Sequence, residues 1–215
     1  TWGLLLTGRL TATASDTGLA ATLTRLIARG GEPLIRRGLN IAMRLMGEQF
    51  VVGQTIGEAL VTSRKLEAAG FCYSYDMLGE AALTAADSDR YQHDYEQAIH
   101  AIGKASNRRG IHAGPGLSVK LSALHPRYGR AQRRRVMTEL LPRLAALMRL
   151  AHVYDIGVNI DAEEADRLEL SLDLREELCL EPALAGCNGI GIVVQAYMKR
   201  TPFMIDYLVD LARRS

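Results

Sequence analysis

Cysteine is scarce in this sequence, and no two cysteines have the spacing of a metal or disulfide motif. The three cysteines, Cys72, Cys179 and Cys187, are an odd number at scattered positions, and no Cys-x-x-Cys pair occurs. Structural zinc sites and disulfide frameworks both require paired spacings, so neither is predicted. Unpaired thiols are typical of a reducing compartment, which predicts a cytoplasmic protein.

Long apolar runs and a surplus of one charge are also missing. No uninterrupted apolar stretch approaches the roughly 18 residues that span a bilayer. Lys and Arg total 26 against 24 Asp and Glu, a net charge of +2. Because phosphate binding requires a dense basic patch, this balance argues against a nucleic-acid-binding protein. The 48% hydrophobic and 23% charged residues are instead typical of a globular domain.

The first fifty or so residues show only the spacing of helices. Apolar residues share one helical face over residues 19–28. Pro33 suits the first turn of a second helix. A third helix is predicted to begin at Thr55 and to end at Gly70, with Glu58 completing a capping box.

From Cys72 onward, a strand followed by a helix recurs four times. The predicted strands are Cys72 to Met77, Leu117 to Leu124, Gly157 to Ala162 and Gly189 to Tyr197. The first predicted helix begins after a Ser88 cap, and the second runs over residues 130–152 with a kink at Pro142. The third predicted helix lies around residues 168–178, and the fourth starts at a Thr201 cap. This alternation indicates a parallel sheet covered by helices.

Two architectures have this alternation, and one of them is excluded. A dinucleotide-binding sheet requires Gly-x-Gly-x-x-Gly after its first strand, where this chain reads Leu78-Gly79-Glu80-Ala81. The other is the (β/α)₈ barrel, which has eight strands and roughly 250 residues. We therefore predict an α/β chain holding the first four βα units of such a barrel over residues 53–215. A helical arm or connecting segment precedes it over residues 1–52, and the chain is expected to be a piece of a longer protein.

Each predicted strand carries a polar residue near its carboxyl end, on the face opposite its apolar side chains. These residues are Asp76, Lys120, Asp161 and Gln195. In a barrel that face is the interior, and the carboxyl ends of the strands form the mouth that holds the chemistry. The sequence therefore predicts a shared site at the mouth.

Lys120 lies between Val119 and Leu121 in a predicted buried strand, where a free ammonium is costly. It is interpreted either as the group that holds a substrate carboxylate or as a Schiff-base amine. The structural alternative is an ion pair with Asp76 or Asp161.

Other polar residues near the strand ends have simpler interpretations. Glu163 and Glu164 are read as favouring the N-terminus of the following helix through its dipole. His125 is read as a local hydrogen-bonding group in a loop. Gln195 suits the edge of a flat heteroaromatic ring, or equally a buried amide bonded to backbone.

Several runs closely resemble the proline dehydrogenase region of bacterial bifunctional proline utilization A, in order and along essentially the whole chain. Four of these runs are Gly31-Glu32-Pro33-Leu34-Ile35-Arg36, Tyr73-Ser74-Tyr75-Asp76-Met77-Leu78-Gly79-Glu80, Leu121-Ser122-Ala123-Leu124-His125-Pro126-Arg127-Tyr128 and Asn159-Ile160-Asp161-Ala162-Glu163-Glu164. The resemblance implies a distorted (β/α)₈ barrel with noncovalent FAD at its mouth. It implies hydride transfer from proline C5 to the flavin, which forms Δ1-pyrroline-5-carboxylate.

The resemblance also implies roles for individual residues. Lys120 would pair with the proline carboxylate, and Asp76 would support the substrate pocket. Asp161 and the Ala162 backbone would adjoin the flavin, and Gln195 would hydrogen-bond to it. Asp161 and Lys120 are the residues expected to be catalytic.

The partners implied by the resemblance are L-proline, a membrane quinone as electron acceptor, an aldehyde dehydrogenase module elsewhere in the parent chain, and further copies of the protein. A cytoplasmic enzyme with peripheral contact to the inner membrane follows from the quinone. Nucleic acid is expected to bind only through an N-terminal segment absent here.

Two rival functions fit the residues alone. One is a class I aldolase-like barrel with Lys120 as the Schiff-base nucleophile and Asp161 as proton shuttle. The other is a non-catalytic assembly fragment.

The first prediction concerns the chain by itself. Because the family's remaining flavin and substrate contacts lie in the second half of the barrel, residues 1–215 alone should neither bind FAD tightly nor oxidise proline. Purification of this chain and its visible absorbance spectrum check this, and a yellow, active preparation would refute it.

Overall fold

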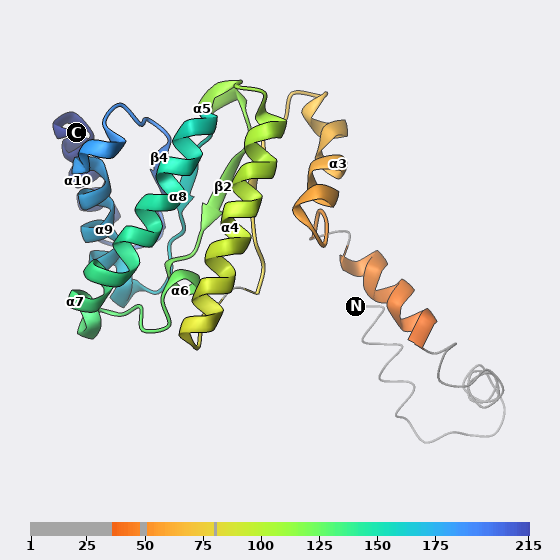
Figure 1. The fold of residues 1–215 in the computed structure, drawn as a ribbon, viewed down its shortest axis with the longest axis horizontal. Coiled ribbons are helices and arrows are strands. Elements are labelled where there is room, and N and C mark those ends of the chain that lie inside the picture. The colour runs from red at the N-terminus through yellow and green to blue at the C-terminus, as the bar shows by residue number, and fades with distance from the viewer. Residues whose placement is uncertain (1–35, 48–50, 80) are drawn as a thin grey trace, which may run out of the picture. The chain divides into compact units, whose positions relative to one another are not determined.

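A computed structural model describes residues 36–47, 51–79 and 81–215 (Figure 1). The chain divides into two compact units, Thr1–Gln54 and Thr55–Ser215. In the first unit a helix covers residues 36–47, which agrees with the second predicted helix. The predicted helix over 19–28 lies outside the described residues.

The second unit is built on a four-stranded parallel sheet. Its strands are β1 (Ser74–Asp76), β2 (Gly116–Val119), β3 (Val158–Ile160) and β4 (Ile190–Ile192), in the spatial order β1-β2-β3-β4. Each strand pairs in parallel with the next one along the chain. This order confirms the predicted βα alternation, and it is the order of successive strands in a (β/α)₈ barrel.

Helices connect the strands and lie against one face of the sheet. The α-helices are α3 (Ile56–Glu67), α4 (Ala85–Ser106), α5 (Gly110–Ala113), α6 (Leu121–Leu124), α7 (Arg133–Arg135), α8 (Leu141–Tyr154), α9 (Leu168–Leu180) and α10 (Thr201–Arg214). Short 3₁₀ segments are η1 (Arg130–Gln132), η3 (Ala165–Arg167) and η4 (Pro182–Leu184). Figure 1 shows α4 and α8 side by side in front of the strands. No helix among the described residues is long and apolar enough to cross a membrane.

The core forms where the apolar face of the sheet meets these helices. The register aligns Tyr75 with Leu117, Leu117 with Val158, and Val158 with Ile190, and all four are buried. Further buried side chains come from α4 and α8, including Tyr95, Ile99, Ile102, Leu144, Leu147 and Met148. The opposite face of the sheet carries the polar residues, as the alternation along the strands predicts.

The strands are shorter than the sequence predicts, and β2 shows why. It ends at Val119, and residues 121–124 form the single turn of α6 instead of continuing the strand. The Lys120 N–H donates to the Tyr95 hydroxyl at 3.0 Å, so a helix side chain takes the place of the next ladder bond. β4 likewise ends at Ile192, and the residues predicted as strand from 193 to 197 are irregular.

The helix starts confirm some predicted caps and correct others. Thr55 caps α3, because its side chain accepts the Glu58 N–H at 3.2 Å. Ser88 does not cap α4. Thr84 does, in a reciprocal box in which its hydroxyl accepts the Asp87 N–H and its own N–H donates to Asp87. Ser88 lies one turn inside the helix, where a cap residue cannot reach the unpaired N–H groups.

The structure also corrects the predicted start of the last helix and the predicted form of the bend near Pro142. Thr201 is the first residue of α10 and not its cap. The predicted kink at Pro142 takes the form of a π-helical segment, η2 (Val136–Leu140), directly before α8. A wider turn accommodates a proline, which lacks an N–H and crowds the preceding carbonyl.

The second prediction tests the close packing of α4 on α8. A Cβ at Gly103 would overlap the ring of Tyr154, whose hydroxyl lies 2.9 Å from His100 Nδ1. Gly103→Ala should therefore destabilise the chain by about 1–3 kcal/mol, the usual cost of overpacking. The matched control is Gly57→Ala in α3, where no side chain crowds the new methyl and the change should be neutral or stabilising by up to about 1 kcal/mol. Urea denaturation followed by circular dichroism measures both, and equal effects would contradict the packing argument.

Candidate active site at the carboxyl ends of the strands

Three of the four predicted site residues meet at the carboxyl ends of β1, β2 and β3. Lys120 Nζ lies 2.6 Å from Asp76 Oδ1 and 3.0 Å from Asp161 Oδ2. The side chains are 28%, 41% and 19% exposed respectively, so the cluster is accessible from the open face of the sheet. The structure therefore brings these three residues together, and the ion pair named above as the structural alternative for Lys120 is present with both Asp76 and Asp161.

The main chain around this cluster is held on both sides. The Asp161 N–H donates to the Val119 carbonyl at 2.9 Å, which extends the β2–β3 ladder by one bond. Tyr95, fully buried on α4, accepts the Lys120 N–H. Lys120 thus stands at the end of a strand and not within one, and it is half-buried where the sequence predicted burial.

The cluster has an uneven charge. One ammonium faces two carboxylates, a formal charge of −1 for the three side chains. Both carboxylates stabilise the protonated lysine, whereas a Schiff-base lysine must attack as the neutral amine. This arrangement favours a lysine that binds by charge over one that acts as a nucleophile.

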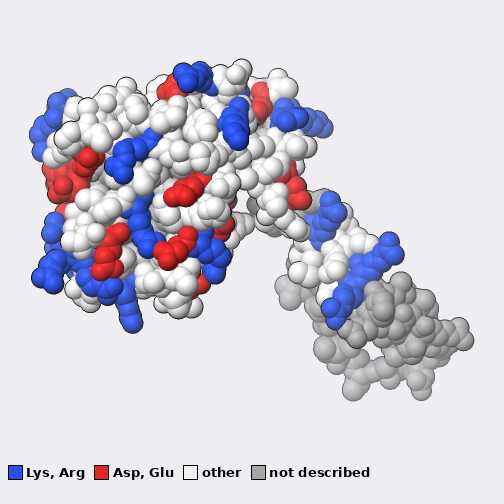
Figure 2. Space-filling model, in the orientation of Figure 1, with Lys and Arg blue, Asp and Glu red and all other residues white. Residues whose placement is uncertain are grey.

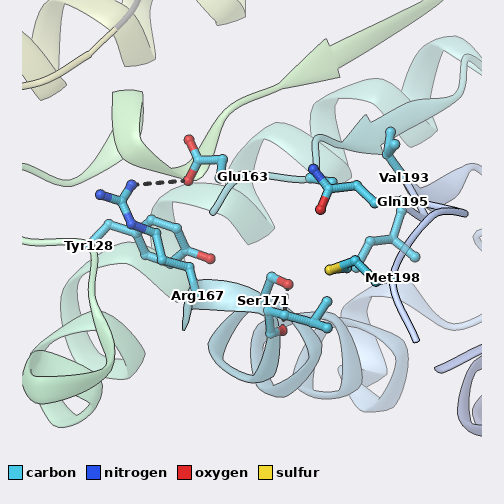
Figure 3. Close-up of a pocket in the computed structure, with 10 residues that line it drawn as sticks. Tyr128, Glu163, Arg167, Ser171, Val193, Gln195 and Met198 are labelled. Atoms are coloured by element: carbon cyan, nitrogen blue, oxygen red, sulfur yellow. Dashed lines mark hydrogen bonds and ion pairs between the residues drawn. The ribbon is translucent and has the colours of Figure 1, made fainter. Parts of the chain in front are cut away.

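Gln195 lies apart from the cluster, in a small neighbouring pocket (Figure 3). The pocket holds about 10 Å³, room for one water molecule, and Ala162, Glu163 and Val193 are among its lining residues. Figure 3 shows Gln195 and Met198 on one side of it, across from Glu163 and Arg167. The structure thus places Gln195 next to the chain segment that follows Asp161.

The side chain and the backbone of Gln195 are used differently. Its carbonyl accepts the Thr201 hydroxyl at 2.6 Å and the Met198 N–H at 3.3 Å, which fixes the turn into α10. No hydrogen bond within the described part of the chain uses its side-chain amide. The sequence allows two interpretations of Gln195, a partner for a flat ring or a buried amide bonded to backbone. The described residues show no such backbone bond. An unused amide beside the exposed Val193 fits the edge and face of a flat heteroaromatic ring.

Glu163 is the residue that sequence reasoning misjudged. Its side chain is only 10% exposed, and one of its oxygens accepts both the N–H of Ser122, at 3.3 Å, and the Ser122 hydroxyl. Its other oxygen faces Arg167 at 3.5 Å. Glu164 is 65% exposed and pairs with the same arginine at 3.2 Å. Parity along the chain does not separate these neighbours, because both lie beyond the strand.

Tyr128 supports the floor of the small pocket. Its ring is buried, and the Arg167 guanidinium lies 5.5 Å from the ring centroid. Burial raises the pKa of its hydroxyl, and the negative charge of Glu163 raises that pKa further. Tyr128 therefore stays neutral and acts here by packing and hydrogen bonding.

His125 is a local hydrogen-bonding group, as predicted. Its Nδ1 accepts the Arg127 N–H at 3.1 Å, so Nε2 carries the ring proton and donates to Glu139 at 3.1 Å. The imidazole is 3% exposed. It thus ties the loop after α6 to η2.

Comparison with known proteins agrees with this geometry. A family model described as proline dehydrogenase matches residues 59–215. The chain therefore belongs to the proline dehydrogenase family, whose members are generally flavoenzymes.

The relatives include both long and short proteins. The chain is 69% identical over its whole length to the bifunctional protein PutA of Klebsiella aerogenes, and spans 16% of that protein. It is 29% identical over 169 residues, 78% of its length, to proline dehydrogenase 1 of Bacillus subtilis strain 168, half of which it spans.

Solved structures of proline utilization A share the fold. A mutant of the Bradyrhizobium japonicum protein is 49% identical, with a TM-score of 0.70, over 88% of this chain and 19% of its own. The Bdellovibrio bacteriovorus protein, inactivated by N-propargylglycine, is 25% identical, with a TM-score of 0.76, over 84% of this chain and 20% of its own.

A second family match corrects one expectation. A model described as the DNA-binding domain of proline dehydrogenase matches residues 1–50, so the expectation that such a segment is absent from this chain is wrong. The net charge of the whole chain concealed it, because residues 1–50 hold six Arg against three acidic residues. Three of these arginines, Arg36, Arg37 and Arg44, lie on the helix over 36–47, which has no acidic residue (Figure 2).

The third prediction follows from the His125–Glu139 contact. Hydrogen bonds from Arg135 and then from His125 lower the pKa of Glu139 from 4.5 to about 2. A group with a lowered pKa contributes its full stability above its unfolded value, here about pH 4.5, and loses it as the pH falls toward 2. Urea midpoints of the chain across this range should therefore fall with pH. Glu139→Gln should lower the neutral-pH midpoint and flatten the slope, and an unchanged slope would contradict the assignment.

Proposed function

We propose that this chain supplies the substrate-carboxylate lysine and part of the flavin pocket of an enzyme that oxidises L-proline to Δ1-pyrroline-5-carboxylate. The observation that carries the proposal is the Lys120 cluster, on the open face at the carboxyl ends of three parallel strands. The family match over the same residues supports this proposal. Because the chain spans 16% of the bifunctional relatives it matches, the activity is proposed for the full-length protein.

The charges of the cluster suit the proline zwitterion. Lys120 would bind the substrate carboxylate, a role that a compact ammonium on a flexible stem performs well. The negative charge that Asp76 and Asp161 contribute would favour the cationic amine of the same molecule. Asp76 is the more exposed of the two and would face the substrate pocket.

The described residues near Gln195 also fit a flavin. When bound, the flavin would be the acceptor for the hydride from proline C5. Gln195 would hold its ring edge through the unused amide, and the exposed Val193 lies at the same pocket. Asp161 and the Ala162 backbone would adjoin it from the segment after β3. We infer FAD as the flavin.

The resemblance extends the proposal to the partners of the full-length protein. A membrane quinone would be the electron acceptor, reached by peripheral contact of a cytoplasmic enzyme with the inner membrane. An aldehyde dehydrogenase module would complete the oxidation, in keeping with the bifunctional relatives. Residues 1–52 would form the arm or connecting segment, residues 53–215 the first half of the barrel, and the protein would be a homo-oligomer.

The Schiff-base alternative is less well supported, since Lys120 is flanked by two carboxylates that stabilise its charge. Borohydride trapping of Lys120 with a carbonyl substrate would restore it. A purely assembly role would require a full-length protein that folds and has no proline-oxidising activity.

The fourth prediction concerns Lys120→Ala in the full-length protein. Loss of a charged hydrogen bond worth about 1.5–3 kcal/mol should raise the KM for proline at least about tenfold. The visible absorbance of the bound flavin should stay, since Lys120 is assigned to substrate and not to cofactor. Lys104→Ala, on the exposed surface of α4, is the matched control and should change neither quantity. An unchanged KM in the Lys120 variant would contradict the assigned role.

A further inference from the structure

Ser122 connects the three chain segments that carry the site cluster. It lies two residues after Lys120, at the start of α6. Its carbonyl accepts the N–H of Ala82 at 3.1 Å, in the segment that follows Asp76 at the end of β1. Its own N–H and hydroxyl both donate to Glu163, in the segment after β3. One residue thus bonds to both of the segments that follow the carboxylates flanking Lys120.

Glu163 is the acidic partner in this connection, and it is nearly buried. At 10% exposure its carboxylate has lost most of its water, so it depends on the three donors supplied by Ser122 and Arg167. Arg167 in turn lies against the ring of buried Tyr128. A buried carboxylate with several charge-assisted bonds holds its surroundings rigidly.

The Lys120–Asp161 pair therefore lies between two fixed points. Before it, the Asp161 N–H is bonded to the Val119 carbonyl at 2.9 Å. After it, Glu163 is bonded to Ser122. Only Ala162 separates Asp161 from Glu163, so the second bond also fixes the backbone that the proposed function places beside the flavin.

From this geometry we propose that Glu163 and Ser122 form a positioning pair for the reaction. In this role the pair acts through the neighbouring backbone, by fixing its position, and not through a step of the reaction itself. It holds the segment after β3 against the segment after β2, and so keeps Asp161 and the Ala162 backbone in register with Lys120. The inference rests on the proposed function for its effect on catalysis, while its effect on the two segments is independent of that function.

The experiment uses the full-length protein, four single variants and the double variant Glu163→Ala/Ser122→Ala. Glu163→Ala removes the connection, whereas Glu163→Gln keeps an oxygen that accepts from Ser122 and loses the charge and the acceptor that faces Arg167. Ser122→Ala removes the hydroxyl and keeps the N–H. Glu164→Ala is the matched control, because it removes an exposed neighbour that pairs with the same Arg167.

Two measurements decide the proposal. The first is steady-state oxidation of proline with an artificial electron acceptor, alongside the visible spectrum of the bound flavin. The second is amide hydrogen exchange of peptides covering residues 119–124 and 159–165. If the pair positions the site, Glu163→Ala should lower kcat/KM on the order of 10- to 100-fold, as small misplacements of reacting groups do. Its exchange should accelerate in both peptides.

The remaining variants should rank by how much of the connection they keep. Glu163→Gln should restore most of kcat/KM, Ser122→Ala should show a smaller loss than Glu163→Ala, and the double variant should be no worse than Glu163→Ala alone. Glu164→Ala should match the wild type. If Glu163→Ala fails to fold, the ranking of Glu163→Gln and Ser122→Ala against Glu164→Ala decides in its place.

Several results would overturn the positioning role. In one, the Glu163 variants lower only the melting temperature and leave kcat/KM, the flavin spectrum and exchange unchanged. In another, Glu164→Ala has the same effect as Glu163→Ala. A wild-type protein that does not oxidise proline would instead overturn the proposed function. In that case hydrogen exchange alone decides, and equal exchange in wild type and Glu163→Ala would refute the connection between the segments.

Discussion

The parallel register of four short strands is the constraint on which the site depends. Because each strand pairs with the next in the same direction, their carboxyl ends emerge at one edge of the sheet. The apolar residues Tyr75, Leu117, Val158 and Ile190 fix that register by burying one face against the helices. A slip of one residue in β2 would turn Lys120 toward the core and away from both carboxylates.

At the carboxyl ends of these strands, the charged residues that would bind substrate lie next to buried groups that hold them in place. Lys120 is kept charged by two carboxylates and accessible by its position beyond the strand. The polar groups that hold it are better buried than the cluster itself, with Tyr95 on one side and the Ser122–Glu163 bond on another. This gradient from exposed charge to buried support is what a site requires if its reacting groups are to meet a substrate without moving apart.

Periodicity sufficed to predict the sheet, its parallel sense and the meeting of Asp76, Lys120 and Asp161, because side-chain parity and strand direction are local properties. It did not predict where β2 ends, since that depends on a hydroxyl from Tyr95, 25 residues away along the chain. Nor did it separate Glu163 from Glu164, because their difference lies in a contact with Ser122 that crosses 41 residues. The basic character of residues 1–50 was concealed by averaging charge over the whole chain.

The most direct test of the account is a crystal structure of the full-length protein with a proline analogue that cannot be oxidised. The account predicts the analogue's carboxylate within ion-pair distance of Lys120 Nζ, with Asp161 and Gln195 lining the flavin. An analogue bound elsewhere, with its carboxylate away from Lys120, would contradict it.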